Sequence, residues 1–317
     1  MTWPEMGKCI KESGYIIPVF VGVMLGIAGF TMDTSKLVQQ SGNFRAIIPV
    51  LVSTYILAPL LAYGLSQALV PIDKETSLPD KNFLPAMMIM AAQAGSLASA
   101  IALTLMAGGN RELALICTLA SNGLTVLLTP FVLELSIGAK VEFNIANMIA
   151  KMGLVVLLPI IAGQLLRPLL WEKTKRGHGF ILIIPQLIIL MFVYAGFSAA
   201  TEQLIQDKSI VLRFLAACVL LHLFLLGATT IVSSTLKLSW PDRTALILCG
   251  SQKTLPNGIY IWNTFFVSNP YGAVPLVLYH LFQLILDTLL LPFFEKRNPV
   301  SPENRGRSTA INCHQGE

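Results

Sequence analysis

A lysine and a proline interrupt an apolar stretch that is long enough to cross a bilayer. The stretch covers residues 243–264, and residues 249–258 at its centre contain Lys253 and Pro256. A charged side chain at bilayer depth is unfavourable, and a proline removes a backbone hydrogen bond from a helix. Nonhelical backbone at this depth is tolerated only where it is packed in protein or lines a water-filled cavity. The segment therefore predicts a broken helix that binds a ligand, as in a transporter, with the polar side chains Ser251, Gln252, Lys253 and Asn257.

A second apolar segment, residues 84–107, carries a smaller polar cluster. Gln93, Ser96 and Ser99 place side-chain oxygens beside Gly95. Such oxygens, together with carbonyl groups freed by a break in the helix, suit a monovalent cation. Small residues in membrane helices also let two helices approach closely, so helix packing is the alternative interpretation.

The next helix, expected over residues 112–135, has polar residues at helical spacing on roughly one face. They are Thr118, Ser121, Asn122 and Thr125. One interpretation is that this face supplies ligands to the break in the preceding segment. The other is that these side chains hydrogen-bond to backbone or to neighbouring helices.

Spacings of three and four residues also place His280, Gln283 and Asp287 on one helix face. We expect Asp287 to face the second break and to pair with Lys253; an aspartate at the membrane interface is the alternative. Loss of either partner of a buried pair costs on the order of 3–5 kcal/mol. Lys253 could then serve as a fixed cation, a proton carrier or a counter-ion for an anionic substrate. His222 lies in an otherwise apolar helix, where a packing hydrogen bond is expected.

The elements that position these residues follow from composition. The chain has 54% hydrophobic and 12% charged residues and a mean hydropathy of +0.69. Soluble domains have about 25% charged residues, so an all-α polytopic membrane protein is expected. The net charge of +5 is spread over short loops, which does not suggest nucleic-acid binding. Apolar runs predict nine spans, over residues 15–31, 46–70, 84–107, 112–135, 148–169, 179–199, 210–235, 243–266 and 272–294.

The distribution of lysine and arginine predicts the orientation. More of them fall on one side of the nine spans if the N-terminus is outside and the C-terminus is cytoplasmic. This favours an integral protein of the plasma or cytoplasmic membrane. The polar tail, residues 295–317, is expected to be disordered on the cytoplasmic side. The five cysteines suggest no disulfide framework.

A weak internal repeat divides the chain. The letters of residues 128–131 align with those of residues 290–293, which brings the fourth span onto the ninth and the third onto the eighth. This predicts a first repeat, residues 1–135, that lacks its opening helix, and a second, residues 136–294. An odd number of helices per repeat makes the two copies inverted. Breaks at matching places in inverted halves are typical of transporters.

At these residues the chain resembles the bile acid:sodium symporter superfamily, and within it the SBF-like subgroup. The most specific matches are residues 249–255 with Gly258, and residues 278–280 with Gln283. The resemblance implies two inverted five-helix repeats, arranged as a panel domain and a core domain with two crossed broken helices. It also implies secondary transport of an organic anion, often coupled to sodium.

The resemblance also implies site residues. Family sodium ligands map onto Ser96 or Ser99, Ser121, Asn122, Thr125, Ser251 and Gln252, and Thr54 falls where another ligand lies. The bile-acid carriers have a glutamate where this chain has Ser251, Gln252 and Lys253. Our hypothesis is that the Lys253 ammonium occupies the place of one sodium ion. Asp287 is a second departure, because the subgroup usually has a small residue there.

These observations favour a secondary active transporter of a small or amphipathic organic anion that works by alternating access. Its expected partners are the lipid bilayer, the anion, and sodium or a proton. A cation/proton exchanger that uses Lys253 and Asp287 is one alternative, and a non-transporting membrane regulator is another. We expect no enzyme and no cofactor, because no nucleophile and base are placed together.

Overall fold

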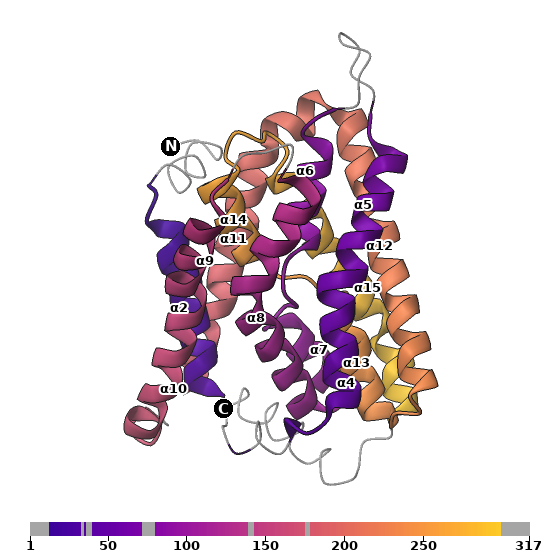
Figure 1. Cartoon of the computed structure of the whole chain (residues 1–317). Helices are drawn as coiled ribbons and strands as arrows, with labels where there is room; N and C mark the ends of the chain where they lie inside the picture. Colours follow the sequence, from indigo (N-terminus) through magenta and orange to yellow (C-terminus); the bar gives the residue numbers. More distant parts are fainter. Residues whose placement is uncertain are drawn as a thin grey trace, which may run out of the picture.

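The computed structural model describes residues 13–32, 35, 40–71, 80–138, 143–174 and 178–298, and its regular elements in those ranges are helical (Figure 1). Six uninterrupted helical stretches are long and apolar enough to cross a membrane, which confirms an all-α polytopic membrane protein. They are Phe44–Leu69, Arg111–Ile137, Ile145–Leu170, Gly179–Glu202, Lys208–Thr235 and Ala273–Arg297. In the secondary-structure assignment, α8 is Arg111–Ile137, α11 is His178–Gln206, α12 is Lys208–Thr235 and α15 is Ala273–Arg297.

Both predicted breaks are present. The third predicted span consists of α6 (Phe83–Ala91) and α7 (Ser99–Met106), and the eighth consists of α13 (Trp240–Ser251) and α14 (Leu255–Phe265). Thr254 adopts extended backbone at the start of α14, and Pro256 follows in the first turn, where its missing N–H breaks no helical hydrogen bond. Figure 1 shows α6 and α14 toward one end of the molecule and α7 and α13 toward the other.

Two further membrane helices contain a π-helical turn. The turn η1 (Ser53–Leu57) joins α4 (Phe44–Val52) to α5 (Ala58–Leu69). The turn η2 (Gly153–Leu157) joins α9 (Ile145–Met152) to α10 (Leu158–Leu170). A proline follows each turn by two residues, Pro59 in one case and Pro159 in the other. A π-turn shifts backbone hydrogen bonds locally, and such turns are frequent at functional sites.

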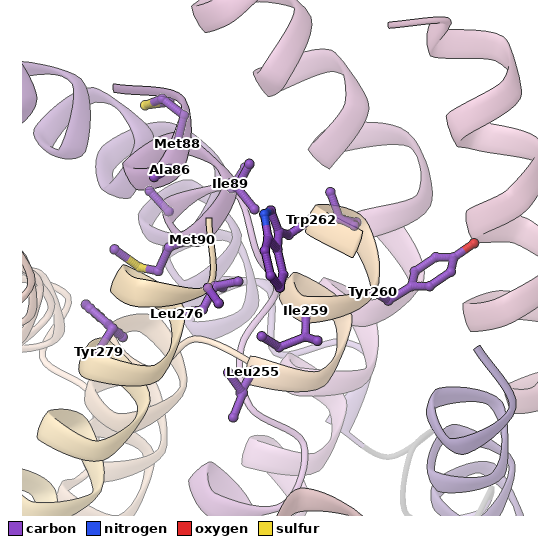
Figure 2. Packing of buried hydrophobic residues seen from close by; sticks show 14 of the residues in the cluster. Ala86, Met88, Ile89, Met90, Leu255, Ile259, Tyr260, Trp262, Leu276 and Tyr279 are labelled. Carbon is purple, nitrogen blue, oxygen red and sulfur yellow. The ribbon is translucent and has the colours of Figure 1, made fainter. Parts of the chain in front are cut away.

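The packing around the breaks is apolar and close. Figure 2 shows side chains of α6, α14 and α15 gathered around Trp262. Gly258 lets α14 approach α15, because a Cβ there would collide with the side chain of Leu276. In a separate pair, α2 (Ile16–Thr31) lies against α10, where Gly29 faces the backbone of Ile160. Small residues therefore set the distance between helices, as expected for membrane packing.

The C-terminal boundary differs from the prediction. A polar tail was expected from Glu295, but α15 continues to Arg297 and Asn298 is 2% exposed. The Asn298 amide donates to the Ala107 carbonyl (2.9 Å) and the Thr244 hydroxyl (2.8 Å). These two hydrogen bonds fix the end of α15 against the α7 and α13 ends. Residues 299–317 lie outside the described residues.

Candidate functional site

The two breaks meet directly through their backbones. The Thr254 N–H donates to the Ala94 carbonyl at 2.9 Å, so an extended segment of one break lies against the other. Gly95 makes this approach feasible, because a Cβ at that position would lie 3.1 Å from the Cys249 carbonyl oxygen. Asn122 of α8 supports the same turn by donating to the Gly95 carbonyl at 2.9 Å. We call this meeting of residues 92–98 with residues 252–254 the crossover.

Lys253 is buried at the crossover with its ammonium bound by backbone carbonyl groups. Its side chain is among the largest that are fully enclosed, with the residue 2% exposed. The Nζ atom donates to the Thr54 carbonyl at 2.8 Å and to the Gln93 carbonyl at 3.1 Å. No described carboxylate lies within ion-pair distance of it. The predicted ion pair between Lys253 and Asp287 is therefore wrong.

The Thr54 carbonyl is available because of the π-helical turn. The N–H of Ala58 donates to the Ser53 carbonyl across this turn rather than to Thr54. The next backbone nitrogen belongs to Pro59, which has no N–H. Neither of the two usual helical donors therefore reaches the Thr54 carbonyl. A buried carbonyl needs a donor, and the Lys253 ammonium provides it.

Gln283 explains why Asp287 does not reach Lys253. The Gln283 side chain accepts from the Lys253 N–H and donates to the Lys253 carbonyl, each at 2.8 Å. These bonds hold the Lys253 peptide units against α15 while its side chain points to the other break. Asp287 lies one helical turn further along the same face, so it meets Gln252. The Gln252 amide donates to Asp287 Oδ2 at 2.6 Å.

Asp287 is paired with His222 of α12. His222 Nε2 lies 3.0 Å from Asp287 Oδ1, and both side chains are 0% exposed. This ion pair joins α15 to α12. The sequence predicted a packing hydrogen bond for His222, but it did not identify Asp287 as the partner. The available signal was an ionisable residue inside a membrane helix, which is a reason in itself to expect a functional partner.

Tyr279 links this pair to the second break. Its hydroxyl donates to the Ser251 carbonyl at 2.6 Å, and its oxygen lies 3.2 Å from His222 Nδ1. Both ring nitrogens of His222 therefore have a polar partner, Tyr279 at Nδ1 and Asp287 at Nε2.

The predicted serine and glutamine residues form one connected group. The Ser99 hydroxyl contacts Ser96 Oγ and Gln252 Oε1, each at 2.7 Å. Through Gln252 the group extends to Asp287. This chain of hydrogen bonds therefore runs from the start of α7 to α15, across both breaks.

The remaining predicted residues have other partners. Gln93 accepts from Asn257 (2.8 Å) and donates to the Ile89 carbonyl (2.6 Å), which joins the two breaks a second time. Ser121 and Ser251 bond carbonyls of their own helices, and Thr125 bonds Thr129. The structure therefore brings Gln93, Ser96, Ser99, Asn122, Gln252, Lys253, Asn257, Gln283 and the Thr54 carbonyl together at the crossover. The Ser121 hydroxyl lies beside Gly95 at the edge of that group, whereas the Thr125 and Ser251 hydroxyls bond elsewhere.

Helix ends of both signs meet at the crossover. α7 and α14 begin there, and neither has a side-chain cap among the described residues. Their first N–H groups and the positive ends of their dipoles suit an anion. α6 and α13 end there, and the Gln93 carbonyl just after α6 already accepts from the Lys253 ammonium. The arrangement can hold an anion and a cation at adjacent places, which is how broken membrane helices bind solutes.

A buried crossover of two broken membrane helices is typical of solute transporters, and sequence comparison identifies the family. Residues 1–296 match the SBF-like CPA transporter family, and the chain belongs to that family. The uncharacterized protein PA2026 of Pseudomonas aeruginosa is 29% identical over 93% of this chain and 88% of its own length. The YfeH protein of Escherichia coli is 26% identical over 93% and 89%. Sodium/bile acid cotransporter 7-B of Xenopus laevis is 23% identical over 92% and 85%.

Proposed function

We propose that the chain is a secondary active transporter that moves a small or amphipathic organic anion by alternating access. The observation that carries this proposal is the crossover itself, where a buried ammonium and two uncapped helix starts lie together. The positive groups would attract the anion, and movement of the crossover helices against the others would expose it to each side in turn. Under this proposal the repeats are residues 1–135 and 136–294, with the N-terminus outside and the C-terminus cytoplasmic in the plasma or cytoplasmic membrane.

Sodium is the coupling ion that the relatives' names suggest. In this chain the candidate ligands are the Ser96 and Ser99 hydroxyls and the Gln252 side-chain oxygen, which already lie within hydrogen-bond distance of one another. The nearby carboxylate of Asp287 contributes negative charge through Gln252. Hydroxyl and amide oxygens are suitable ligands for a hard monovalent cation, so we include sodium as a co-substrate.

Two measurements test this function. The first is the apparent Tm of the purified protein in sodium chloride and in choline chloride, because a bound ion stabilises the folded state by mass action. The second is uptake of radiolabelled taurocholate, as a probe anion, into liposomes with an inward sodium gradient. Ser99→Ala should abolish sodium-dependent stabilisation, and Ser136→Ala, whose hydroxyl bonds its own helix, is the control. Uptake equal to that of empty liposomes for a panel of organic anions would contradict the proposal.

A second candidate is proton-coupled exchange, and the buried pair of His222 and Asp287 favours it. Buried ionisable pairs in membrane helices commonly mark proton pathways. Liposomes that contain a pH-sensitive dye would separate the two candidates. Proton movement driven by a sodium gradient, without any organic anion, would support exchange, and its loss in Asp287→Asn would assign it to this pair.

A further inference from the structure

We propose that the crossover contains a monovalent-cation site that the chain fills with its own Lys253 ammonium. The inference rests on the proposed function, because it names the cation that accompanies the anion at that site. This site is separate from the candidate sodium site of the proposed function. The sodium site is formed by Ser96, Ser99 and Gln252, whereas the carbonyl groups around Lys253 form the site described here.

The ligands of the Lys253 ammonium are those of a cation site. Lys253 Nζ has oxygen partners from two separate elements, the Thr54 carbonyl of η1 and the Gln93 carbonyl after α6. Both carbonyls lie where the regular helix is interrupted, which frees them from helical donors. Converging carbonyls of unwound helices are the usual ligands of transported monovalent cations. The site therefore has the ligands of an alkali cation, but the positive group that it holds is a side chain of the protein.

Two further buried oxygens in this region accept no hydrogen bond from the described residues. Thr54 Oγ1 and Asn257 Oδ1 are buried and have no hydrogen-bond partner among the described residues. Thr54 and Asn257 are 0% and 3% exposed. The Asn257 amide nitrogen is bonded to Gln93, whose own carbonyl contacts Lys253. Buried oxygens rarely lack a partner, so these two mark acceptors available to a cation in the same region.

The groups around the Lys253 ammonium do not include a negative charge among the described residues. The ammonium has no carboxylate at ion-pair distance among the described residues, and Asp287 is bonded to His222 and Gln252. The charge is stabilised by neutral dipoles alone, as an alkali cation would be in such a site. Buried charges are otherwise paired with an opposite charge. A cation fixed to the chain cannot be released with the substrate, so this position would contribute charge without contributing a transported ion.

The test removes the lysine side chain and offers other cations. Lys253→Ala leaves space and unpaired carbonyls, whereas Lys253→Met fills the same space without a charge. The apparent Tm of full-length wild type and both variants is measured in chlorides of choline, sodium, potassium, ammonium and methylammonium. We expect Lys253→Ala to be destabilised in choline and to regain about 3 °C or more, saturably, in one of the small cations. All variants are also made in the Ser99→Ala background, which lacks the other candidate cation site, and there the variant that keeps Lys253 and the Lys253→Met variant should not show this response.

Each outcome decides the inference. If Lys253→Ala cannot be purified in choline chloride, the yield of folded protein in methylammonium chloride replaces the Tm as the readout. No recovery in any salt, equal Tm values in all salts, or the same cation response in Lys253→Met would overturn the inference. Ser99 and Gln252 form the other candidate cation site, which Ser99→Ala removes. A cation response that persists in the Ser99→Ala background therefore belongs to the site around Lys253. Because no transport is measured, failure of taurocholate uptake would contradict the proposed function without affecting this result.

Discussion

Asp287 contacts His222 through one carboxylate oxygen, at 3.0 Å from Nε2, and contacts Gln252 through the other, at 2.6 Å from Nε2. The same carboxylate thus joins α15 to α12 and to the break between α13 and α14. Tyr279 adds a second connection, because its hydroxyl bonds both His222 and the Ser251 carbonyl. A change in the charge of this pair would therefore act on the crossover from two directions.

Replacement of Asp287 should depend strongly on the new side chain. Asp287→Ala leaves the Gln252 amide and His222 without a buried partner, and we expect a loss of about 3–5 kcal/mol in the free energy of unfolding. Asp287→Asn can accept from Gln252 and donate to His222 Nε2, so its loss should be about 1 kcal/mol. Chemical denaturation in detergent would measure both. Equal losses for the two variants would contradict the geometry described here.

The hydrogen bonds around His222 predict a spectroscopic difference. Because the Tyr279 hydroxyl donates to Ser251, we expect a protonated Nδ1 and a proton shared between Nε2 and Asp287 in wild type, and a bare Nε2 in Asp287→Asn. Nitrogen NMR of protein labelled at histidine distinguishes these states for each ring nitrogen. His222→Gln identifies the signal, and His280→Gln serves as the control for the other histidine near the crossover. A wild-type His222 signal with a bare Nδ1 would show that the assigned hydrogen-bond directions are wrong.

Gly95 should not tolerate a side chain. A Cβ would lie 3.1 Å from the Cys249 carbonyl oxygen, so the two breaks would have to separate. We expect Gly95→Ala to lose about 1–3 kcal/mol in the free energy of unfolding. Gly123→Ala is the matched control, because a Cβ there meets nothing within 4 Å. The control substitution should be neutral or stabilising by up to about 1 kcal/mol. A Gly95→Ala variant as stable as this control would contradict the close contact.

The sequence predicts the helices and both breaks because each depends on local chemistry. Apolar length predicts the spans, and Lys253 with Pro256 marks where the eighth span is interrupted. The group of Ser96, Ser99 and Gln252 could also be anticipated, because the two breaks were expected to meet. The inverted repeat and the orientation remain predictions.

The partners of Lys253 and Asp287 could not be predicted from the sequence. Lys253 binds main-chain carbonyls, and every residue has one, so no letter identifies Thr54 or Gln93 as the acceptors. The pairing of Asp287 with His222 depends on the register between α12 and α15, which is set by tertiary packing. The expectation that opposite charges attract led to the wrong pair. Gln283 holds the lysine backbone in a place where its ammonium points away from α15.

The position of the Thr54 carbonyl depends on the number of residues in the π-helical turn at Ser53–Leu57. Such a turn holds one residue more than an α-helical turn. Deleting Ser53 would restore regular helix and bring the Ala58 N–H to the Thr54 carbonyl. That carbonyl would then accept from its own helix rather than from Lys253. Many substitutions that keep the length of this turn should be tolerated, whereas loss of this one residue would leave the lysine with one carbonyl ligand fewer.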